Sequence, residues 1–82
     1  MSAPITIRFY GRLAEAIAPA IAVDGECSVA QLRERLARDH PHVAATLASR
    51  YSRACVGDRL VRDDFVVRAG AEIEFLPPVS GG

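Results

Sequence analysis

The stretch Ser28-Val29-Ala30-Gln31-Leu32-Arg33-Glu34-Arg35-Leu36 carries the clearest structural signal in the sequence. Ser28 followed three residues later by Gln31 forms a capping box, a pattern that begins α-helices. The apolar residues behind it recur at helical spacing: Val29, Leu32 and Leu36. Three arginines are expected to lie off this apolar stripe: Arg33, Arg35 and Arg38. Because Pro41 bounds the segment, the sequence predicts one amphipathic helix that must pack against another element.

Patterns before this helix predict two strands and a short helix. Residues 5–10 alternate between apolar and polar side chains, the period of a strand with one face toward a core. Residues 12–18 show helical spacing and stop before Pro19, which disfavours a helical residue ahead of it. The run Ala20–Val23 is rich in strand-forming residues. We expect it to pair with the first strand in a hairpin-like arrangement.

Patterns after the main helix predict a shorter helix and three more strands. Residues 42–49 show helical spacing, with Val43 and Leu47 facing inward. Two short strands are expected around the tight turn Gly57-Asp58, at residues 54–56 and 60–61. Alternating residues predict a last strand: Glu72, Ile73, Glu74 and Phe75. This succession of strands and helices predicts a fold of the α+β class.

Length and composition restrict the chain to one small domain and exclude several functional classes. The chain has 82 residues, half of them apolar, and its ten basic residues balance ten acidic ones. No basic field therefore favours nucleic acid or an anionic membrane. The longest apolar-looking stretch, residues 13–23, is too short to span a bilayer. Because no secretory signal pattern is present, we expect a cytoplasmic protein in which Cys27 and Cys55 are reduced.

The sequence ends on Gly81-Gly82, directly after a proline-containing run. Pro77 and Pro78 restrict φ and favour an extended polyproline II path, on which residues 77–82 would reach roughly 19 Å from the body. Glycine has no Cβ, so the last two residues can enter a channel too narrow for a side chain. We therefore expect a domain at residues 1–76 and a flexible tail at residues 77–82, with the Gly82 carboxylate as the working group.

The ending Phe75-Leu76-Pro77-Pro78-Val79-Ser80-Gly81-Gly82 resembles the tail of the molybdopterin synthase small subunits, the MoaD branch of the MoaD/ThiS sulfur-carrier family. The likeness covers most of the chain, including residues 5–10 and the start of the main helix. It departs at two turn positions: Gly57 and Ala71. The resemblance implies a β-grasp, or ubiquitin-like, fold with a mixed sheet of about five strands and one main helix packed across it.

The resemblance also implies a chemistry for Gly82. A MoeB-like activating enzyme, similar to the E1 of ubiquitin, would use ATP to adenylate the Gly82 carboxylate, and a sulfurtransferase would supply the sulfur that replaces AMP. The resulting thiocarboxylate would attack a cyclic pyranopterin monophosphate held by a MoaE-like large subunit of molybdopterin synthase. The chain would then bind no cofactor or metal itself, and would act as the non-catalytic, sulfur-donating subunit of the complex.

The resemblance assigns roles to the residues before Gly82 as well. Five residues would thread into the channel of the partner: Pro77, Pro78, Val79, Ser80 and Gly81. Phe75 and Leu76 are expected as apolar contacts with the partner. For Phe75, a position in the core is equally compatible with the pattern, so both interpretations stay open.

Other reactive side chains have ordinary interpretations. Cys27 precedes a helix N-terminus, which can lower a thiol pKa, but its position also suits packing against Leu32. Cys55 lies in an apolar strand and is expected to be buried. His40 and His42 have no third metal ligand at convincing spacing and are expected at a solvated helix end.

Asp63 and Asp64 are expected to form a surface turn, with contact to an activating enzyme as a second interpretation. All ten basic residues are Arg, which either protects an activated carboxylate from side-chain amines or reflects a compositional preference. Three other functions stay open: sulfur delivery for thiamin thiazole or cysteine synthesis, joining of Gly82 to a lysine of a target protein, and a β-grasp binding module with an incidental diglycine.

Overall fold

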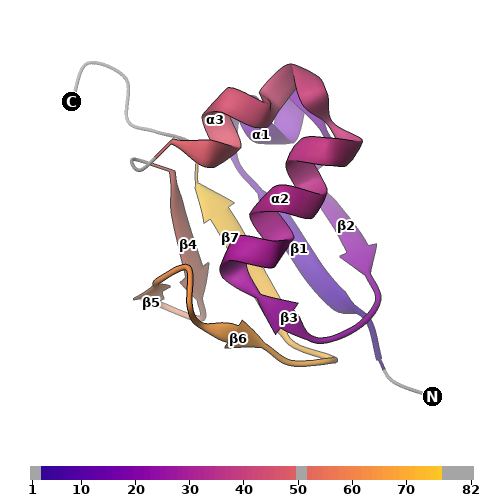
Figure 1. Cartoon of the computed structure of the whole chain (residues 1–82), viewed down its shortest axis with the longest axis vertical. Coiled ribbons are helices and arrows are strands. Elements are labelled where there is room, and N and C mark those ends of the chain that lie inside the picture. Colours follow the sequence, from indigo (N-terminus) through magenta and orange to yellow (C-terminus); the bar gives the residue numbers. More distant parts are fainter. Residues whose placement is uncertain (1–2, 50–51, 77–82) are drawn as a thin grey trace.

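A computed structural model describes residues 3–49 and 52–76. The elements follow in the order β1 (Ile5–Phe9), α1 (Gly11–Ala16), β2 (Ala20–Val23), β3 (Cys27–Ser28), α2 (Val29–Asp39), the 3-10 turn η1 (Pro41–Val43), α3 (Ala44–Ala48), β4 (Arg53–Val56), β5 (Arg59–Val61), β6 (Val66–Val67) and β7 (Glu72–Leu76). Five of the strands form one sheet in the order β2-β1-β7-β4-β5, and β3 pairs with β6 in a second, two-stranded sheet. The helices lie on one side of the large sheet, with α2 crossing it (Figure 1).

The two central strands of the large sheet come from opposite ends of the chain. β1 and β7 are parallel, with Ile7 opposite Ile73 and Phe9 opposite Phe75. β2 lies antiparallel to β1, and β4 lies antiparallel to both β5 and β7. The parallel pair at the centre is therefore flanked by antiparallel pairings, one on the side of β2 and two on the side of β4 and β5. This mixed five-stranded sheet with one main helix across it confirms the α+β class and the β-grasp arrangement.

The core lies between the large sheet and the helices. Its sheet side is formed by alternate residues of β1 and β7: Ile5, Ile7, Phe9, Ile73 and Phe75. Its helix side includes the predicted stripe and two inward residues of the shorter helical segments: Val29, Leu32, Leu36, Val43 and Leu47. Burying each large apolar side chain is worth about 1.5 to 3 kcal/mol. The alternation along β1 and the stripe along α2 are therefore the main sequence determinants of this fold.

Helix α2 begins as the capping box predicts. The Ser28 hydroxyl accepts a hydrogen bond from the Gln31 amide at 3.2 Å, and the Gln31 side chain accepts one from the Ser28 amide at 2.9 Å. The connection between β5 and β6 supplies acceptors for the amides of the two residues between Ser28 and Gln31. Val29 donates to the carbonyl of Phe65 and Ala30 to that of Asp63, both at 2.9 Å. The first amides of α2 have no acceptor within the helix, and these bonds fix them to the connection between β5 and β6.

Three elements differ from the sequence predictions. Helix α1 ends at Ala16 instead of residue 18, because Ile17 already caps it through a bond from its amide to the carbonyl of Leu13. The helical segment predicted at residues 42–49 is divided into η1 and α3. The pairing of β3 with β6 was not predicted, since strands of two residues show no period. The predicted turn at Gly57 is confirmed, with a φ of +64° that favours glycine.

Candidate functional site at the end of the last strand

The predicted working group is the tail that follows β7. Its six residues lie outside the described residues: Pro77, Pro78, Val79, Ser80, Gly81 and Gly82. Leu76 is the last residue of β7 and the last described before the tail. The candidate site is therefore built from the residues that surround Leu76. We call Leu76 the tail root.

The tail root is held by a serine on the neighbouring strand segment. Leu76 is partly buried and lies opposite Arg53 of β4. The hydroxyl of Ser52, the residue before β4, donates a hydrogen bond of 3.2 Å to the Leu76 carbonyl. Ser52 is only 3% exposed, and it is the buried polar residue of the described ranges. Because a buried hydroxyl requires partners, this contact fixes both residues.

A single arginine connects the tail root to the helices. Arg33 on α2 donates from Nη2 to the Ser52 carbonyl at 2.8 Å and from Nη1 to the Leu47 carbonyl at 2.7 Å. Leu47 lies in the last turn of α3, whose carbonyls have no partner within the helix. The guanidinium of Arg33 therefore caps the C-terminus of α3 and also donates to the backbone carbonyl of Ser52.

Two further contacts complete the environment of Arg33. Its Nε lies 3.0 Å from a carboxylate oxygen of Asp63, and its Cζ lies 5.2 Å from the centroid of the Phe75 ring. The Arg33 side chain is 14% exposed, whereas that of Asp63 is 64% exposed. A cation over an aromatic face is attracted by the negative face of the ring. Arg33 thus sits between solvent and core, with its charge satisfied on both sides.

The expectation that Arg33 lies off the buried stripe was wrong. Apolar faces of helices recur at i, i+3, i+4 and i+7, and from Val29 these positions are Leu32, Arg33 and Leu36. Arg33 occupies the i+4 position and consequently faces the sheet. This position within the stripe is the signal that the sequence offered. Ser52 gave no comparable signal and was missed.

Phe75 belongs to the core and not to a partner-facing surface. Its side chain is 0% exposed, and its ring packs nearly parallel to that of Phe9, with centroids 6.3 Å apart. The role as an apolar contact for a partner is therefore corrected, since a fully buried ring cannot reach another protein. Leu76 is partly exposed, so the corresponding prediction stays open for that residue.

The outer face of the sheet is polar beside the tail root. Arg8 pairs with Glu72 at 3.0 Å across β1 and β7, with both side chains about half exposed. A hydrogen bond to Glu74, with smaller contributions from desolvation and charge, raises the pKa of the Tyr10 phenol. Cys55 lies opposite Glu74 and Leu60 and is partly buried, which corrects the expectation of full burial. Desolvation, then the charge of Glu74, raises the pKa of its thiol.

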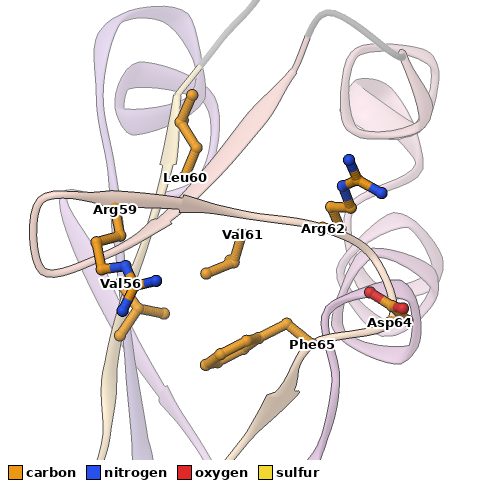
Figure 2. A pocket seen from close by; sticks show the side chains of 7 residues that line it. All are labelled: Val56, Arg59, Leu60, Val61, Arg62, Asp64 and Phe65. Atoms are coloured by element: carbon orange, nitrogen blue, oxygen red, sulfur yellow. The ribbon is translucent and has the colours of Figure 1, made fainter.

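A hollow of about 430 Å³ lies beside β5 and the connection to β6. Figure 2 shows Val61 and Phe65 pointing into it, with Val56 and Arg59 at its side. Leu60 and Phe65 are 60% and 41% exposed. Apolar side chains left in solvent mark interaction surfaces when they gather. Among the described residues, those that line the hollow include no nucleophile beside a base, so it suits an apolar side chain of a partner better than a reaction.

The remaining candidates have structural roles. Cys27 is partly buried in β3 and packs against the core. His42 is exposed and places Nε2 3.0 Å from the Ala16 carbonyl, and its ring meets that of His40 edge to face. Across residues 3–49 and 52–76, no three His, Cys, Asp or Glu side chains gather as metal ligands would. Asp63 and Asp64 are both exposed in the connection between β5 and β6, as expected.

A comparison with known protein families shows which family this chain belongs to. The profile of the ThiS family matches residues 7–82, nearly the whole chain. The chain belongs to the ThiS family. No curated protein matches this ThiS-family chain by sequence. The family groups small carriers of sulfur with ubiquitin-like modifiers, which agrees with the β-grasp body described above.

Solved structures similar to this ThiS-family protein share its fold at low sequence identity. The crystal structure of SAMP1 from Haloferax volcanii has a TM-score of 0.77 at 23% identity, covering 96% of this chain and 99% of that one. The small archaeal modifier protein 1 from Methanosarcina acetivorans has a TM-score of 0.81 at 19% identity, covering 100% and 99%. A putative molybdopterin converting factor, subunit 1, from Pyrococcus furiosus has a TM-score of 0.80 at 17% identity, covering 95% and 100%.

In the part of the chain that the structure describes, no helix of this ThiS-family protein is long and apolar enough to cross a bilayer.

Proposed function

We propose that this protein is the sulfur-carrier subunit of a molybdopterin synthase. The observation that carries the proposal is the sequence Pro77-Pro78-Val79-Ser80-Gly81-Gly82, which follows the central strand β7 directly and falls within the family match. The fold-level likeness to a putative molybdopterin converting factor subunit supports the same pathway. The proposal requires Gly82 to be the terminal residue of the mature protein.

The chemistry follows from the weakness of a carboxylate as an electrophile. An activating enzyme joins the Gly82 carboxylate to the α-phosphate of ATP, releasing pyrophosphate and forming an acyl-adenylate. Sulfide-level sulfur (HS⁻) then attacks the acyl carbon, AMP leaves with the bonding electrons, and loss of the sulfur-bound proton gives the thiocarboxylate. The thiocarboxylate is a better nucleophile than the carboxylate. Its sulfur attacks the pterin substrate in the large subunit, and water then cleaves the acyl–sulfur bond, which leaves the sulfur on the pterin and returns the Gly82 carboxylate. This chain contributes the reacting terminal group and no catalytic side chain.

The body of the protein supports a role in presentation. The tail root is surrounded by the polar outer face of the sheet, the buried Ser52 and Arg33. Among these described side chains, no nucleophile lies beside a general base. The exposed Leu60 and Phe65 beside β5 offer apolar surface to a partner. We expect partners to recognise the body while the tail enters their active sites.

Mass spectrometry of the intact protein tests the proposal. The chain is produced with and without its cognate activating enzyme and sulfurtransferase, and the mass first establishes whether Gly82 is terminal. We expect a gain equal to the replacement of one oxygen by one sulfur, located at Gly82 by fragmentation. A variant with one alanine added after Gly82 should show no gain, whereas an Arg38→Ala variant, changed at an exposed position of α2, should behave like the wild type.

Two outcomes would redirect the proposal. Recovery of Gly82 in isopeptide linkage to target lysines, without thiocarboxylate, would favour protein modification, in line with the name of the similar modifier protein from Methanosarcina acetivorans. Thiocarboxylate without sulfur transfer to the pterin substrate in the presence of the large subunit would favour a carrier for thiazole or cysteine synthesis. Because this chain contains no lysine, any isopeptide bond formed through a lysine side chain must join another protein.

A further inference from the structure

We propose that Arg33 and Ser52 are positioning residues that fix where and in which direction the tail leaves the body. We call these two residues the tail-root clamp. The inference rests on the proposed function, because it concerns how the carboxylate of that tail is presented to an activating enzyme. It assigns a role to two side chains that the carrier chemistry does not otherwise use.

The first step is the carbonyl of Leu76. In a sheet, a strand carbonyl is satisfied by an amide of a neighbouring strand or by a substitute. The residue after Leu76 is Pro77, whose ring restricts Leu76 to extended conformations. The Ser52 hydroxyl donates a hydrogen bond of 3.2 Å to the Leu76 carbonyl, beside the pairing of Leu76 with Arg53. The last peptide before the tail is therefore held by a side chain.

The second step is the rigidity of Ser52 itself. Its amide donates to the Ser49 carbonyl at 3.0 Å, its carbonyl accepts from Arg33 at 2.8 Å, and its hydroxyl donates to Leu76. All three of its polar groups are engaged, and the residue is 3% exposed. A buried serine with every group bonded has one arrangement available. Leu76 is consequently bonded to a fixed point.

The third step is the connection of that point to the rest of the fold. Arg33 is bonded to the carbonyl at the end of α3 and to the carboxylate of Asp63, and it covers the ring of Phe75. Its hydrogen-bond partners come from three separate parts of the chain, 14 to 30 positions away. Movement of the tail root thus requires movement of α2, α3 and the β5–β6 connection together.

The consequence concerns the presentation of the tail. A partner that binds the body receives the reacting carboxylate only if the tail starts at the right place, and misplacement by about 1 Å can cost on the order of a hundredfold in rate. Binding of the body contributes mainly to KM, whereas correct entry of the tail contributes to kcat. The clamp should therefore affect kcat for adenylation more than KM for this chain.

The experiment compares Ser52→Ala, Arg33→Lys and the control Arg38→Lys in a pyrophosphate exchange assay with the cognate activating enzyme. Arg38 is an exposed arginine on the same helix. All proteins are assayed at a temperature at which circular dichroism shows each fully folded. We expect kcat to fall about three- to tenfold for the clamp variants, as the loss of one hydrogen bond predicts, with KM within about twofold.

A Gly-Gly insertion between Leu76 and Pro77 separates positioning from stability. The insertion disconnects the tail from the clamp, so Ser52→Ala should cause no further loss of kcat in that background. An equal loss in both backgrounds would overturn the inference, since it would mean that Ser52 acts only through the stability of the body. Unchanged kcat in the clamp variants with the normal tail would overturn it as well.

An NMR measurement keeps the inference testable if the proposed function fails. Failure of the wild type to be adenylated would count against the carrier function alone. Independently of the assay, the backbone order parameter of the Leu76 amide in the wild type should match those of the other residues of β7. It should fall in Ser52→Ala and Arg33→Lys, and it should stay unchanged in Arg38→Lys. An unchanged order parameter in the clamp variants would overturn the inference whatever the assay shows.

Discussion

The guanidinium carbon of Arg33, on α2, lies 5.2 Å from the centroid of the Phe75 ring, on β7. One residue is charged and the other fully buried, so their contact marks the boundary between core and solvent at the tail root. The same guanidinium bonds two carbonyls and a carboxylate. The pair therefore joins the packing of the core to the polar network that holds Leu76.

Replacing Arg33 with alanine should destabilise the protein substantially. The carbonyls of Leu47 and Ser52 would lose their donor, and leaving a buried polar group unsatisfied costs about 1 to 3 kcal/mol. Urea unfolding followed by circular dichroism should show a lower midpoint at an unchanged slope. The control Arg38→Ala should stay within about 0.5 kcal/mol of the wild type; a similar loss in both variants would contradict this account of Arg33.

The ion pair of Arg33 with Asp63 should contribute much less than the carbonyl contacts. The Asp63 side chain is 64% exposed, and pairs in solvent are worth about 0 to 1 kcal/mol. Asp63→Asn should therefore lower the unfolding free energy by less than Arg33→Ala does. The difference in unfolding free energy between Asp63→Asn and the wild type should shrink in high salt. A loss as large as that of Arg33→Ala would place the main energy in the ion pair instead.

Phe75 and Leu76 should separate cleanly as a core residue and a surface residue. Phe75→Ala should cost about 3 to 5 kcal/mol of unfolding free energy, since it empties a buried site. Leu76→Ala should have a much smaller effect on stability and instead weaken binding to the activating enzyme, measured by calorimetry. If Leu76→Ala leaves that affinity unchanged, the predicted contact of Leu76 with the partner is wrong.

The two prolines of the tail should contribute to affinity through entropy. Replacing Pro77 and Pro78 with glycine frees two residues whose φ is otherwise restricted, and each such change costs about 0.4 to 1 kcal/mol when the segment is ordered. Affinity for the activating enzyme should fall about four- to thirtyfold, the equivalent of that free energy. The unfolding midpoint of the body should stay unchanged, and a loss of stability without a loss of affinity would refute the interpretation.

Cys55 should react slowly at neutral pH and influence stability only in alkali. Desolvation and the neighbouring Glu74 raise its pKa in the folded state, so less thiolate is present than in an unfolded chain. In a Cys27→Ala variant, alkylation by iodoacetamide at pH 8 should be slower in the native protein than in urea. The unfolding free energy should be constant below the ordinary thiol pKa and fall above it, because the unfolded chain then loses its proton first. Cys55→Ser should remove the decrease that begins at the ordinary thiol pKa, whereas the further decrease above the ordinary phenol pKa, caused by the raised pKa of Tyr10, should persist. Persistence of the decrease at the thiol pKa would assign it to another group.

Local patterns in the sequence predicted most of the fold. The capping box at Ser28, the alternation along β1 and the turn at Gly57 each depend on residues within a few positions, and each is confirmed. The pattern along β7 placed Phe75 on the same face as Ile73, which is where the structure has it. The suggestion of a surface role for Phe75 came from the resemblance of the ending to a family and not from the alternation.

Local sequence patterns did not predict the contacts of the tail-root clamp. Arg33 was assigned by its charge to the solvent, although its position in the helical stripe pointed inward. Its partners lie 14 to 30 residues away, and they are mainly backbone carbonyls, which every residue carries. Ser52 is one small polar residue whose burial depends on the approach of α2 and β7. Contacts of this kind follow from tertiary packing and leave little trace in composition or spacing.

The parallel pairing of β1 with β7 has a consequence for synthesis on the ribosome. β7 lies between β1 and β4, so the two halves of the sheet have no common neighbour until the last strand has been translated. We expect nascent chains that stop before Glu72 to remain unfolded and to be removed by proteases. Proteolysis would then ensure that only polypeptides carrying the closing strand accumulate.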